Sequence, residues 1–374
     1  MAGHPPVDVA IVGAGIIGSA IAWRCVQRGL SVAIADPDPS RGAWNTAAGM
    51  LAPVTELHYA ESALLRLNLA SAARWPAFAA ELSDASGVGT GLRETGTIEA
   101  AWDFADLAAL RDLHAFGATL GLSSRLLTGT ELRDLEPALA PGLPGGLLAE
   151  YDHQVDPRRV HRALTAALTA AGVTVLPLDA VPTVSGVRAT GMTLAGDSAV
   201  PAGVVVLAAG AWSGRLAADV PVRPVKGQTL RLRSASAPLQ RVVRATVQGS
   251  EVYVVPRADG EIVVGASSEE AGFDQQPRAG AVYELLRDAQ SVLPELGEAT
   301  LVEMSTGLRP GTADNAPLLG PSGVDGLVLA TGHYRNGVLL TPITADGIAA
   351  YIADGVLPDE LVPFGADRRA EALR

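Results

Sequence analysis

Residues 7–18 read VDVAIVGAGIIG, and residues 31–36 read SVAIAD. The first stretch predicts a buried strand that passes through a glycine turn into a helix, and the second predicts another buried strand. Gly13 permits the tight turn, Gly15 lets the backbone approach a pyrophosphate, and Gly18 lets the helix pack close to the strand. The N-terminus of that helix presents free N–H groups and a partial positive charge to phosphates. This strand–turn–helix–strand unit is typical of a dinucleotide-binding fold.

Asp36 ends the second stretch. In such a unit, an acid at the end of the second strand accepts hydrogen bonds from ribose hydroxyls. A GxGxxG motif alone is weak evidence for nucleotide binding. Here the strand, the helix, the second strand and the acid all occur in register. We therefore predict that this segment binds the ADP half of a dinucleotide.

The chain has 374 residues, a net charge of −12 and a sequence pI near 5.0. This length favours two domains or one elaborated α/β unit. The acidic balance argues against nucleic acid or an anionic membrane as a partner. We find no signal peptide and no apolar stretch of membrane-helix length, and the single cysteine, Cys25, cannot form an internal disulfide. We therefore expect a cytoplasmic protein in which Cys25 is a small core residue.

Two later segments repeat the pattern of a buried strand that runs into glycine. They lie at 204–213 and 326–332, and a helical pattern follows the second from about 337 to 352. Continuous apolar strands next to helices indicate a parallel sheet that is covered on both faces. We therefore expect the chain to return to the first domain after long excursions.

The intervening segments have a different pattern. Residues 221–267 contain alternating apolar and polar runs, which predict antiparallel strands with one solvated face, and residues 257–260 predict a hairpin turn. Residues 61–145 are predicted to be mostly helical. The expected fold is α/β, with a discontinuous Rossmann-type cofactor domain and a second, α+β substrate domain built on an antiparallel sheet. The cofactor domain comprises 1–85, 146–220 and 305–365, and the substrate domain comprises 86–145 and 221–304.

The loop after the second strand favours one kind of dinucleotide. Residues 41–53 are mostly small and nearly uncharged, so their backbone can lie flat against a planar ligand. An ordinary surface loop has a similar composition. A nicotinamide needs no such strip, however, whereas a flavin needs backbone contacts along its ring. Together with the late return of the chain at Gly332, the strip favours FAD over NAD.

Five motifs occur in order along the chain. They are the GAGIIG turn, AAGML at 47–51, PVKGQ at 224–228, GLRPG at 307–311 and GHYRNG at 332–337. Together they resemble the D-amino-acid oxidase family of flavoproteins over nearly the whole chain, and most of all its branch that oxidises glycine for thiamine synthesis. The resemblance implies a discontinuous FAD domain and a substrate domain on an antiparallel sheet. It also implies a homo-oligomer, specifically a tetramer.

The resemblance and the nucleotide motif together imply FAD contacts from many positions. These positions are Gly13, Gly15, Ile16, Ile17, Gly18, Asp36, Pro37, Ala43, Trp44, Ala48, Gly49, Met50, Val181, His333, Tyr334, Arg335, Asn336, Gly337, Val338 and Leu339. We expect the FAD to be noncovalent, because Cys25 lies far in sequence from every segment expected near the flavin ring. The histidines show no metal-ligand spacing, and we expect no metal site.

The resemblance implies that Arg309 and Arg335 bind substrate and that Tyr253 lies on the pocket wall. A guanidinium suits this role because it holds a carboxylate with two parallel hydrogen bonds. Arg335 has an alternative, which is to pair with a carboxylate of the protein. We expect hydride transfer to the flavin, so we propose no catalytic base, and we assign His333 a backbone contact with the ring.

The expected reaction converts glycine or a similar small amino acid to an imine, which water converts to a keto acid and ammonia, while O2 becomes hydrogen peroxide. A D-amino-acid oxidase, a sarcosine oxidase or a dehydrogenase with another electron acceptor remains an alternative, and so does a nonenzymatic FAD-binding regulator. Lys226 is a candidate oxygen-activating cation. Ser267 and Ser268 stand where the glycine-oxidising branch usually has a larger apolar residue, which leaves the side-chain preference open.

Overall fold

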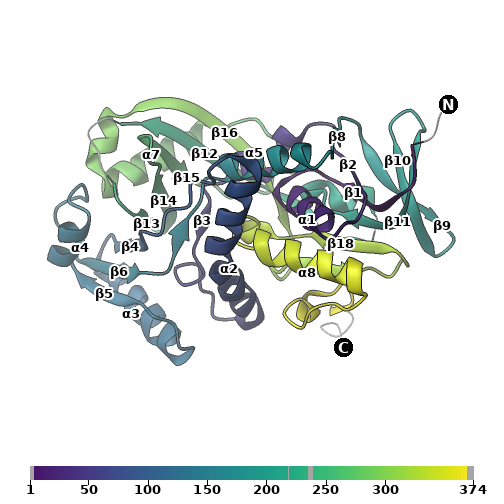
Figure 1. Cartoon of the computed structure of the whole chain (residues 1–374). Coiled ribbons are helices and arrows are strands. Elements are labelled where there is room, and N and C mark those ends of the chain that lie inside the picture. The colour runs from purple at the N-terminus through teal and green to yellow at the C-terminus, as the bar shows by residue number, and fades with distance from the viewer. Residues whose placement is uncertain (1–3, 218, 235–238, 369–374) are drawn as a thin grey trace.

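Within residues 4–217, 219–234 and 239–368, which the computed structural model describes, two large sheets organise the chain. One sheet lies toward each end of the molecule, and helices α2 and α5 lie between them in the view of Figure 1. Within the same ranges, no helix is both long and apolar enough to cross a membrane. The two-part α/β architecture predicted from the sequence is confirmed.

The first sheet has a parallel centre. Its order from edge to edge is β17 (Leu318–Pro321), β18 (Leu327–Thr331), β11 (Ala199–Leu207), β1 (Val7–Val12), β2 (Val32–Ala35) and β8 (Val175–Leu176). Each neighbouring pair runs parallel except β17 with β18. The two late apolar segments therefore return beside β1, as their pattern predicts.

Helices cover one face of this sheet, and a hairpin covers the other (Figure 1). The helices are α1 (Ile16–Gln27), α2 (Ser62–Ser86), α5 (Pro157–Ala170) and α8 (Thr341–Asp354). On the opposite face, β9 (Ala180–Ser185) and β10 (Arg188–Leu194) pair with each other, and β10 also pairs with β11. Both faces are buried, which explains why the central parts of β1, β2, β11 and β18 are apolar.

The glycine turn depends on two missing side chains. Gly13 has φ +105°, and a Cβ there would collide with the backbone of Ala208. A Cβ on Gly18 would collide with the carbonyl of Gly13 and crowd the side chain of Ala208. Gly15 has open space in front of it, where Trp44 is the nearest group at 4.0 Å. These positions match the three roles that the motif predicts.

The second sheet is mostly antiparallel. Its order is β16 (Thr300–Gly311), β12 (Arg223–Arg233), β15 (Glu261–Gly265), β14 (Ser250–Pro256), β13 (Val242–Val247), β4 (Thr97–Ala101), β6 (Gly145–Ala149) and β5 (Arg125–Thr128). The pair β13–β4 is parallel. Helix α7 (Ala279–Val292) packs on β12 to β15, and α3 (Phe104–Thr119) and α4 (Gly129–Leu135) pack near β4 to β6.

The structure differs from the sequence expectation in the region expected to be helical. Helices α2 and α3 form there, but β4, β5 and the start of β6 join the second sheet. The domain divisions expected at 146 and 305 fall inside β6 and β16, which are continuous strands of the second sheet. These short strands are stabilised by neighbours distant in sequence, so local periodicity does not reveal them.

Short elements complete the connections. They are β3 (Met50–Leu51), β7 (His153–Gln154), α6 (Ser213–Leu216) and the 3-10 turns Pro39–Arg41, Ala43–Asn45, Gly210–Trp212, Pro294–Glu298, Tyr334–Asn336 and Val362–Phe364. The late helix α8 starts at Thr341, four residues after the predicted start near Gly337, because a 3-10 turn comes first.

We predict that Gly18→Ala lowers the free energy of unfolding by about 1–3 kcal/mol, because the new methyl group overpacks the crossing of β1 and α1. Gly280→Ala in α7 is the matched control, since no atom lies within 4 Å of its Cβ position. The control should be neutral or slightly stabilising. Urea unfolding of the holoprotein, followed by circular dichroism, measures both variants. Equal stability of the two variants would contradict this packing role.

Candidate active site

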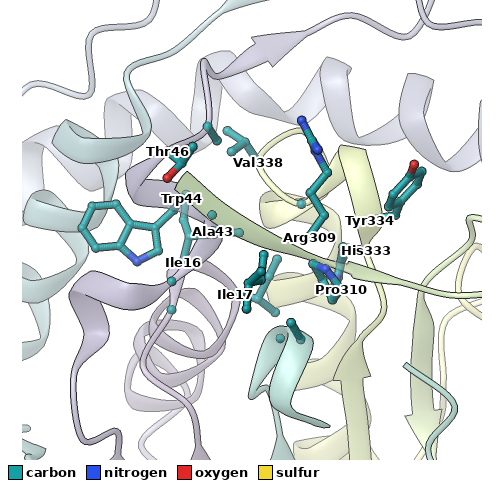
Figure 2. Close-up of a pocket in the computed structure, with 18 of the residues that line it drawn as sticks. Ile16, Ile17, Ala43, Trp44, Thr46, Arg309, Pro310, His333, Tyr334 and Val338 are labelled. Atoms are coloured by element: carbon teal, nitrogen blue, oxygen red, sulfur yellow. The ribbon is translucent and has the colours of Figure 1, made fainter. Parts of the chain in front are cut away.

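A pocket runs from the glycine turn of the first sheet to one face of the second sheet (Figure 2). Its walls come from segments spread over most of the chain: residues 12–17, 35–50, 179–181, 208–216, 227–267 and 307–338 all contribute to the lining. The two domains therefore build one site together. Near β1 the lining combines the glycine turn and apolar groups with Asp36, and near β13 and β4 it includes Arg244 and Glu99.

The end near β1 contains the residues predicted to hold ADP. Gly13, Gly15, Ile16, Ile17, Asp36, Pro37 and Val181 all line the pocket there. The carboxylate of Asp36 accepts hydrogen bonds from the backbone N–H of Ala14 at 2.8 Å and of Asp38 at 2.9 Å. A carboxylate offers about four acceptor sites, so it retains capacity for ribose hydroxyls. Asp36 also ties the glycine turn to the next loop.

The strip after β2 forms another wall. Ala43, Trp44, Ala48, Gly49 and Met50 line the pocket. Gly49 has φ +80°, and a Cβ there would collide with the carbonyl of Val155, so the strip lies directly against the chain behind it. The ring of Trp44 stacks on His161 with centroids 3.9 Å apart and an interplanar angle of 6°. Figure 2 shows Trp44 and Ala43 beside Ile16.

Arg257, at the hairpin between β14 and β15, holds this strip in place. Its buried guanidinium donates to the carbonyl of Ala48 at 2.5 Å, to that of Val155 at 3.0 Å and to Oε1 of Gln154 at 2.9 Å. Burial lowers the pKa of Arg257 to about 10, which still leaves it charged at neutral pH. No pattern in the sequence indicates this role, because all three acceptors lie far from residue 257 in the chain.

The segment after β18 faces the pocket only in part. His333, Tyr334, Arg335, Gly337 and Val338 belong to the lining. Asn336 and Leu339 do not, and Gly18 also lies outside it, at the helix crossing. The carbonyl of Leu339 instead accepts hydrogen bonds from Ser71 at 2.6 Å and Trp75 at 2.9 Å, which joins this segment to α2.

His333 is a buried histidine whose Nε2 lies 3.2 Å from Oγ1 of Thr344. Burial lowers the pKa of His333 to about 3. The imidazole is therefore neutral throughout the physiological range. Such a side chain is held inside the fold, and the expectation that His333 is not a catalytic base stays a prediction.

Arg309 projects from β16 into the pocket (Figure 2). Its guanidinium lies directly over Gly227, where a Cβ would overlap it, and its Nη1 donates to the carbonyl of Ser267 at 3.1 Å. No carboxylate of the described residues forms an ion pair with Arg309. A cation in a pocket without an anionic partner favours an anionic ligand.

Tyr253 lies on the pocket wall beside this cation. Its hydroxyl end fills the space over Gly265 that a Cβ would occupy. Burial raises the pKa of Tyr253, and the opposing effect of Arg309 is smaller. The phenol therefore keeps its proton and remains a hydrogen-bond donor. The structure brings Tyr253 and Arg309 together, as the resemblance implies.

Arg335 also lines the pocket, but it has a partner. Its Nη1 lies 3.1 Å from Oε2 of Glu251, and both side chains are partly exposed. The alternative of a protein carboxylate is therefore realised in this structure. A contact of Arg335 with substrate stays a prediction.

Lys226 does not reach the pocket. Its side chain is fully buried, and its Nζ lies 2.5 Å from the carbonyl of Gln276 and 3.4 Å from Oε2 of Glu269. The candidate role in oxygen activation thus lacks contact with the site. Ser267 does line the pocket, and its hydroxyl donates to Oε1 of Glu269 at 2.7 Å, whereas Ser268 is not part of the lining.

Sequence reasoning missed a group of charged side chains at the far end of the pocket. We call Glu56, Glu99, Arg244 and Glu251 the charged end wall. Arg244 pairs with Glu56, with Nη1 and Oε1 2.7 Å apart. The group was hidden because β4 was not recognised and its partners are distant in sequence. Recognition of TIEAA as a strand would have been the available signal.

Comparisons with known proteins agree with this geometry. A family model described as FAD dependent oxidoreductase, DAO, matches residues 8–351. The chain belongs to this family. Glycine oxidase from Geobacillus kaustophilus is 35% identical over 374 residues, covering 96% of this chain and 97% of the relative. The crystal structure of glycine oxidase from that organism has a TM-score of 0.89 at 34% identity, covering 97% of this chain and 99% of the other.

Two further comparisons differ in how much of the other protein the chain covers. The bifunctional protein ThiO/ThiG of Trichormus variabilis is 33% identical over 351 residues, which cover 93% of this chain and 53% of the relative. The chain thus spans about half the length of that relative. A crystal structure of glycine oxidase from Bacillus cereus has a TM-score of 0.88 at 28% identity, covering 96% of this chain and 98% of the other.

The cofactor of this FAD-dependent oxidoreductase is FAD, and the residues present fit it. Open space remains in front of Gly15, where a phosphate can approach the backbone of the turn, and the missing Cβ atoms at Gly13 and Gly49 let these pocket-lining residues pack against the backbone of Ala208 and Val155. Cys25 is buried in α1 and does not line the pocket, and burial raises its pKa to about 12. A thiol in that position offers no covalent attachment point for a flavin in the pocket.

We predict that Asp36→Ala weakens FAD binding by about 1.5–3 kcal/mol, or roughly ten- to 150-fold in Kd, because charged hydrogen bonds are lost. Fluorescence titration of the apoprotein with FAD measures this loss. Asp8→Ala is the matched control, since Asp8 bonds to Ser31 at the opposite end of β1. If Asp36→Ala holds FAD as tightly as Asp8→Ala, Asp36 does not serve the nucleotide.

Proposed function

We propose that this protein is an FAD-dependent oxidase of glycine or a similarly small amino acid. The observation that carries the proposal is Arg309, an unpaired guanidinium in the pocket of an FAD-dependent oxidoreductase. The names of relatives support the substrate, since proteins called glycine oxidase match nearly the full length of the chain. Relatives called ThiO/ThiG support a product used in thiamine synthesis.

The space around Arg309 suits a small substrate. Three glycines of the second sheet, Gly227, Gly265 and Gly307, lie under Arg309, Tyr253 and Thr46 respectively, and a Cβ on any of them would collide with the group above. The guanidinium binds the substrate carboxylate with two parallel hydrogen bonds. This bond fixes the α-carbon relative to the wall formed by residues 43–50. Orientation of this kind supplies much of the advantage of a bound reactant over a free one.

The chemistry requires little acid–base work from the chain. FAD, when bound, would accept the two electrons of the bond between the α-carbon and its hydrogen. The neutral amine becomes an imine, water converts the imine to an oxo acid and ammonia, and the electrons reduce O2 to hydrogen peroxide. Tyr253 remains protonated and His333 remains neutral, so neither adds a charge beside the substrate. Assembly as a homotetramer belongs to the proposal on the family resemblance alone.

Anaerobic titration of the holoprotein tests the activity directly. We expect glycine to bleach the flavin absorbance, and air to restore it with one hydrogen peroxide formed per turnover. Sarcosine, D-alanine and D-proline are measured in parallel. Faster bleaching by one of these would replace glycine as the substrate. Restoration by a quinone but not by air would identify a dehydrogenase, and a flavin that no amino acid bleaches would leave an FAD-binding protein without this activity.

We predict that Arg309→Met lowers kcat/KM for the amino acid by roughly 30- to several-thousand-fold, because one member of a desolvated ion pair is lost. FAD content should not change. A primary amine without a carboxylate should lose much less activity. The matched control is Arg223→Met, because Arg223 forms an exposed ion pair with Glu270 outside the pocket. Equal losses for the amine and the amino acid would show that Arg309 supports the fold instead.

A further inference from the structure

Arg309 is held in the pocket by a contact that leaves its charge free. Its Nη1 donates to the carbonyl of Ser267 at 3.1 Å, which is the only hydrogen bond of this side chain within the described ranges. A guanidinium has five N–H donors, so most of them remain available to a ligand. A neutral carbonyl orients the guanidinium without cancelling its charge, whereas a carboxylate would cancel it. The position of this one carbonyl therefore determines where the charge of Arg309 is presented.

Ser267 lies near the start of the loop 266–278, which connects β15 to α7 and is tied to β12. The N–H of Ser267 donates to the carbonyl of Gln228 at 3.3 Å, and the N–H of Gln228 donates to Oγ of Ser267 at 3.0 Å. Two residues later, Glu269 and Lys226 exchange backbone hydrogen bonds of 2.9 Å each. The carbonyl of Ser267 lies between these two pairs of hydrogen bonds, so its position depends on them.

The side chain of Glu269 connects these hydrogen bonds to a buried charge. Its Oε1 accepts hydrogen bonds from Oγ of Ser267 at 2.7 Å and from Nε2 of Gln228 at 2.5 Å. Its Oε2 lies 3.4 Å from Nζ of Lys226, whose side chain is fully buried. Burial by itself would raise the pKa of Glu269, but the two hydrogen bonds and the charge of Lys226 outweigh it and lower the pKa. The carboxylate is therefore ionised at neutral pH.

Lys226 and Gln228 also hold the far end of the same loop. Nζ of Lys226 donates to the carbonyl of Gln276 at 2.5 Å, and the N–H of Arg278 donates to Oε1 of Gln228 at 2.8 Å. Both residues belong to the PVKGQ motif, and Gly227 between them lies under the guanidinium in the pocket. Side chains alternate between the two faces of a strand. The motif thus leaves room for the guanidinium on one face of β12 and ties the loop on the other.

We propose that Glu269 is a positioning residue for substrate binding, which holds the carbonyl of Ser267 where Arg309 can meet the substrate carboxylate. This inference rests on the proposed amino-acid oxidase function and adds to it a residue behind the pocket. Glu269 does not line the pocket, and its charge is matched by Lys226. Without Glu269, the hydroxyl of Ser267 would lose its acceptor and Lys226 would be buried with no carboxylate beside it.

Acetate tests the placement of Arg309, because it carries the substrate carboxylate and no amine to oxidise. It is titrated into the oxidised holoprotein, and the flavin absorbance reports only molecules that retain FAD. Glu269→Ala should raise the Kd of acetate about ten- to 100-fold, because small displacements of a binding group carry losses of this size. Glu270→Ala is the matched control, since Glu270 forms an exposed ion pair with Arg223 outside the pocket. The control should keep the wild-type Kd.

Two further variants separate positioning from general loss of structure. Ser267→Ala breaks the link between the Glu269 carboxylate and the residue that holds Arg309, and it should also raise the Kd of acetate. The double variant should bind acetate about as weakly as the weaker single variant, because both changes break one chain of contacts. Glu269→Gln keeps an oxygen acceptor for Ser267 and loses the ion pair, so it should raise the Kd by less than Glu269→Ala.

The outcomes distinguish this inference from the proposed function. An unchanged Kd in every Glu269 variant that retains FAD, or losses that add fully in the double variant, would overturn the positioning role. Arg309→Met serves as the reference. If it loses acetate while the Glu269 variants do not, the proposed function stands and only the role of Glu269 falls. If Arg309→Met binds acetate as tightly as the wild type, both are overturned.

Discussion

The absence of side chains at Gly13 and Gly18 is the constraint on which the structure depends. Because neither residue has a Cβ, α1 packs against the end of β1 and against Ala208. The direction of α1 determines where α5 and α8 pack, and those helices bury one face of the parallel sheet. The later strands β11 and β18 can then join the sheet beside β1. The segment that follows β18 forms the pocket wall that contains His333 and Val338.

A second level of organisation joins the two sheets. Arg257 extends from the second sheet to the carbonyl of Ala48, in the strip that follows β2, and to that of Val155, so one guanidinium couples the substrate side of the pocket to the cofactor side. Asp152 acts similarly on the next loop, since it is buried and accepts hydrogen bonds from the backbone N–H of Val54 and Thr55. That loop also contains Glu56, which forms an ion pair with Arg244. Hydrogen bonds of buried polar side chains therefore connect the two sides of the pocket across the domain boundary.

The parts of the fold that the sequence revealed are those with strong local signals. The segments 9–12, 32–35 and 327–330 are continuous apolar runs, and the glycine motif has a fixed stereochemical meaning, so both could be predicted. β4 could not, because Thr97–Ala101 gains its partners from Val242–Val247 and Gly145–Ala149. The different roles of the arginines could not be predicted from the sequence either. Only the fold distinguishes Arg257, which bonds to carbonyls, and Arg335, which bonds to Glu251, from the unpaired Arg309.

The spread of the pocket lining along the chain has a consequence for the life of the protein in a cell. No early fragment of the polypeptide contains the site, because its walls run from residue 12 to residue 338. FAD can therefore bind only after the long-range contacts have formed, and contacts of this kind slow folding. A ligand that binds only the native state stabilises it, by about 2.7 kcal/mol at 100 times its Kd. The supply of FAD would thus regulate how long newly made chains escape proteolysis, and so how much of the protein accumulates.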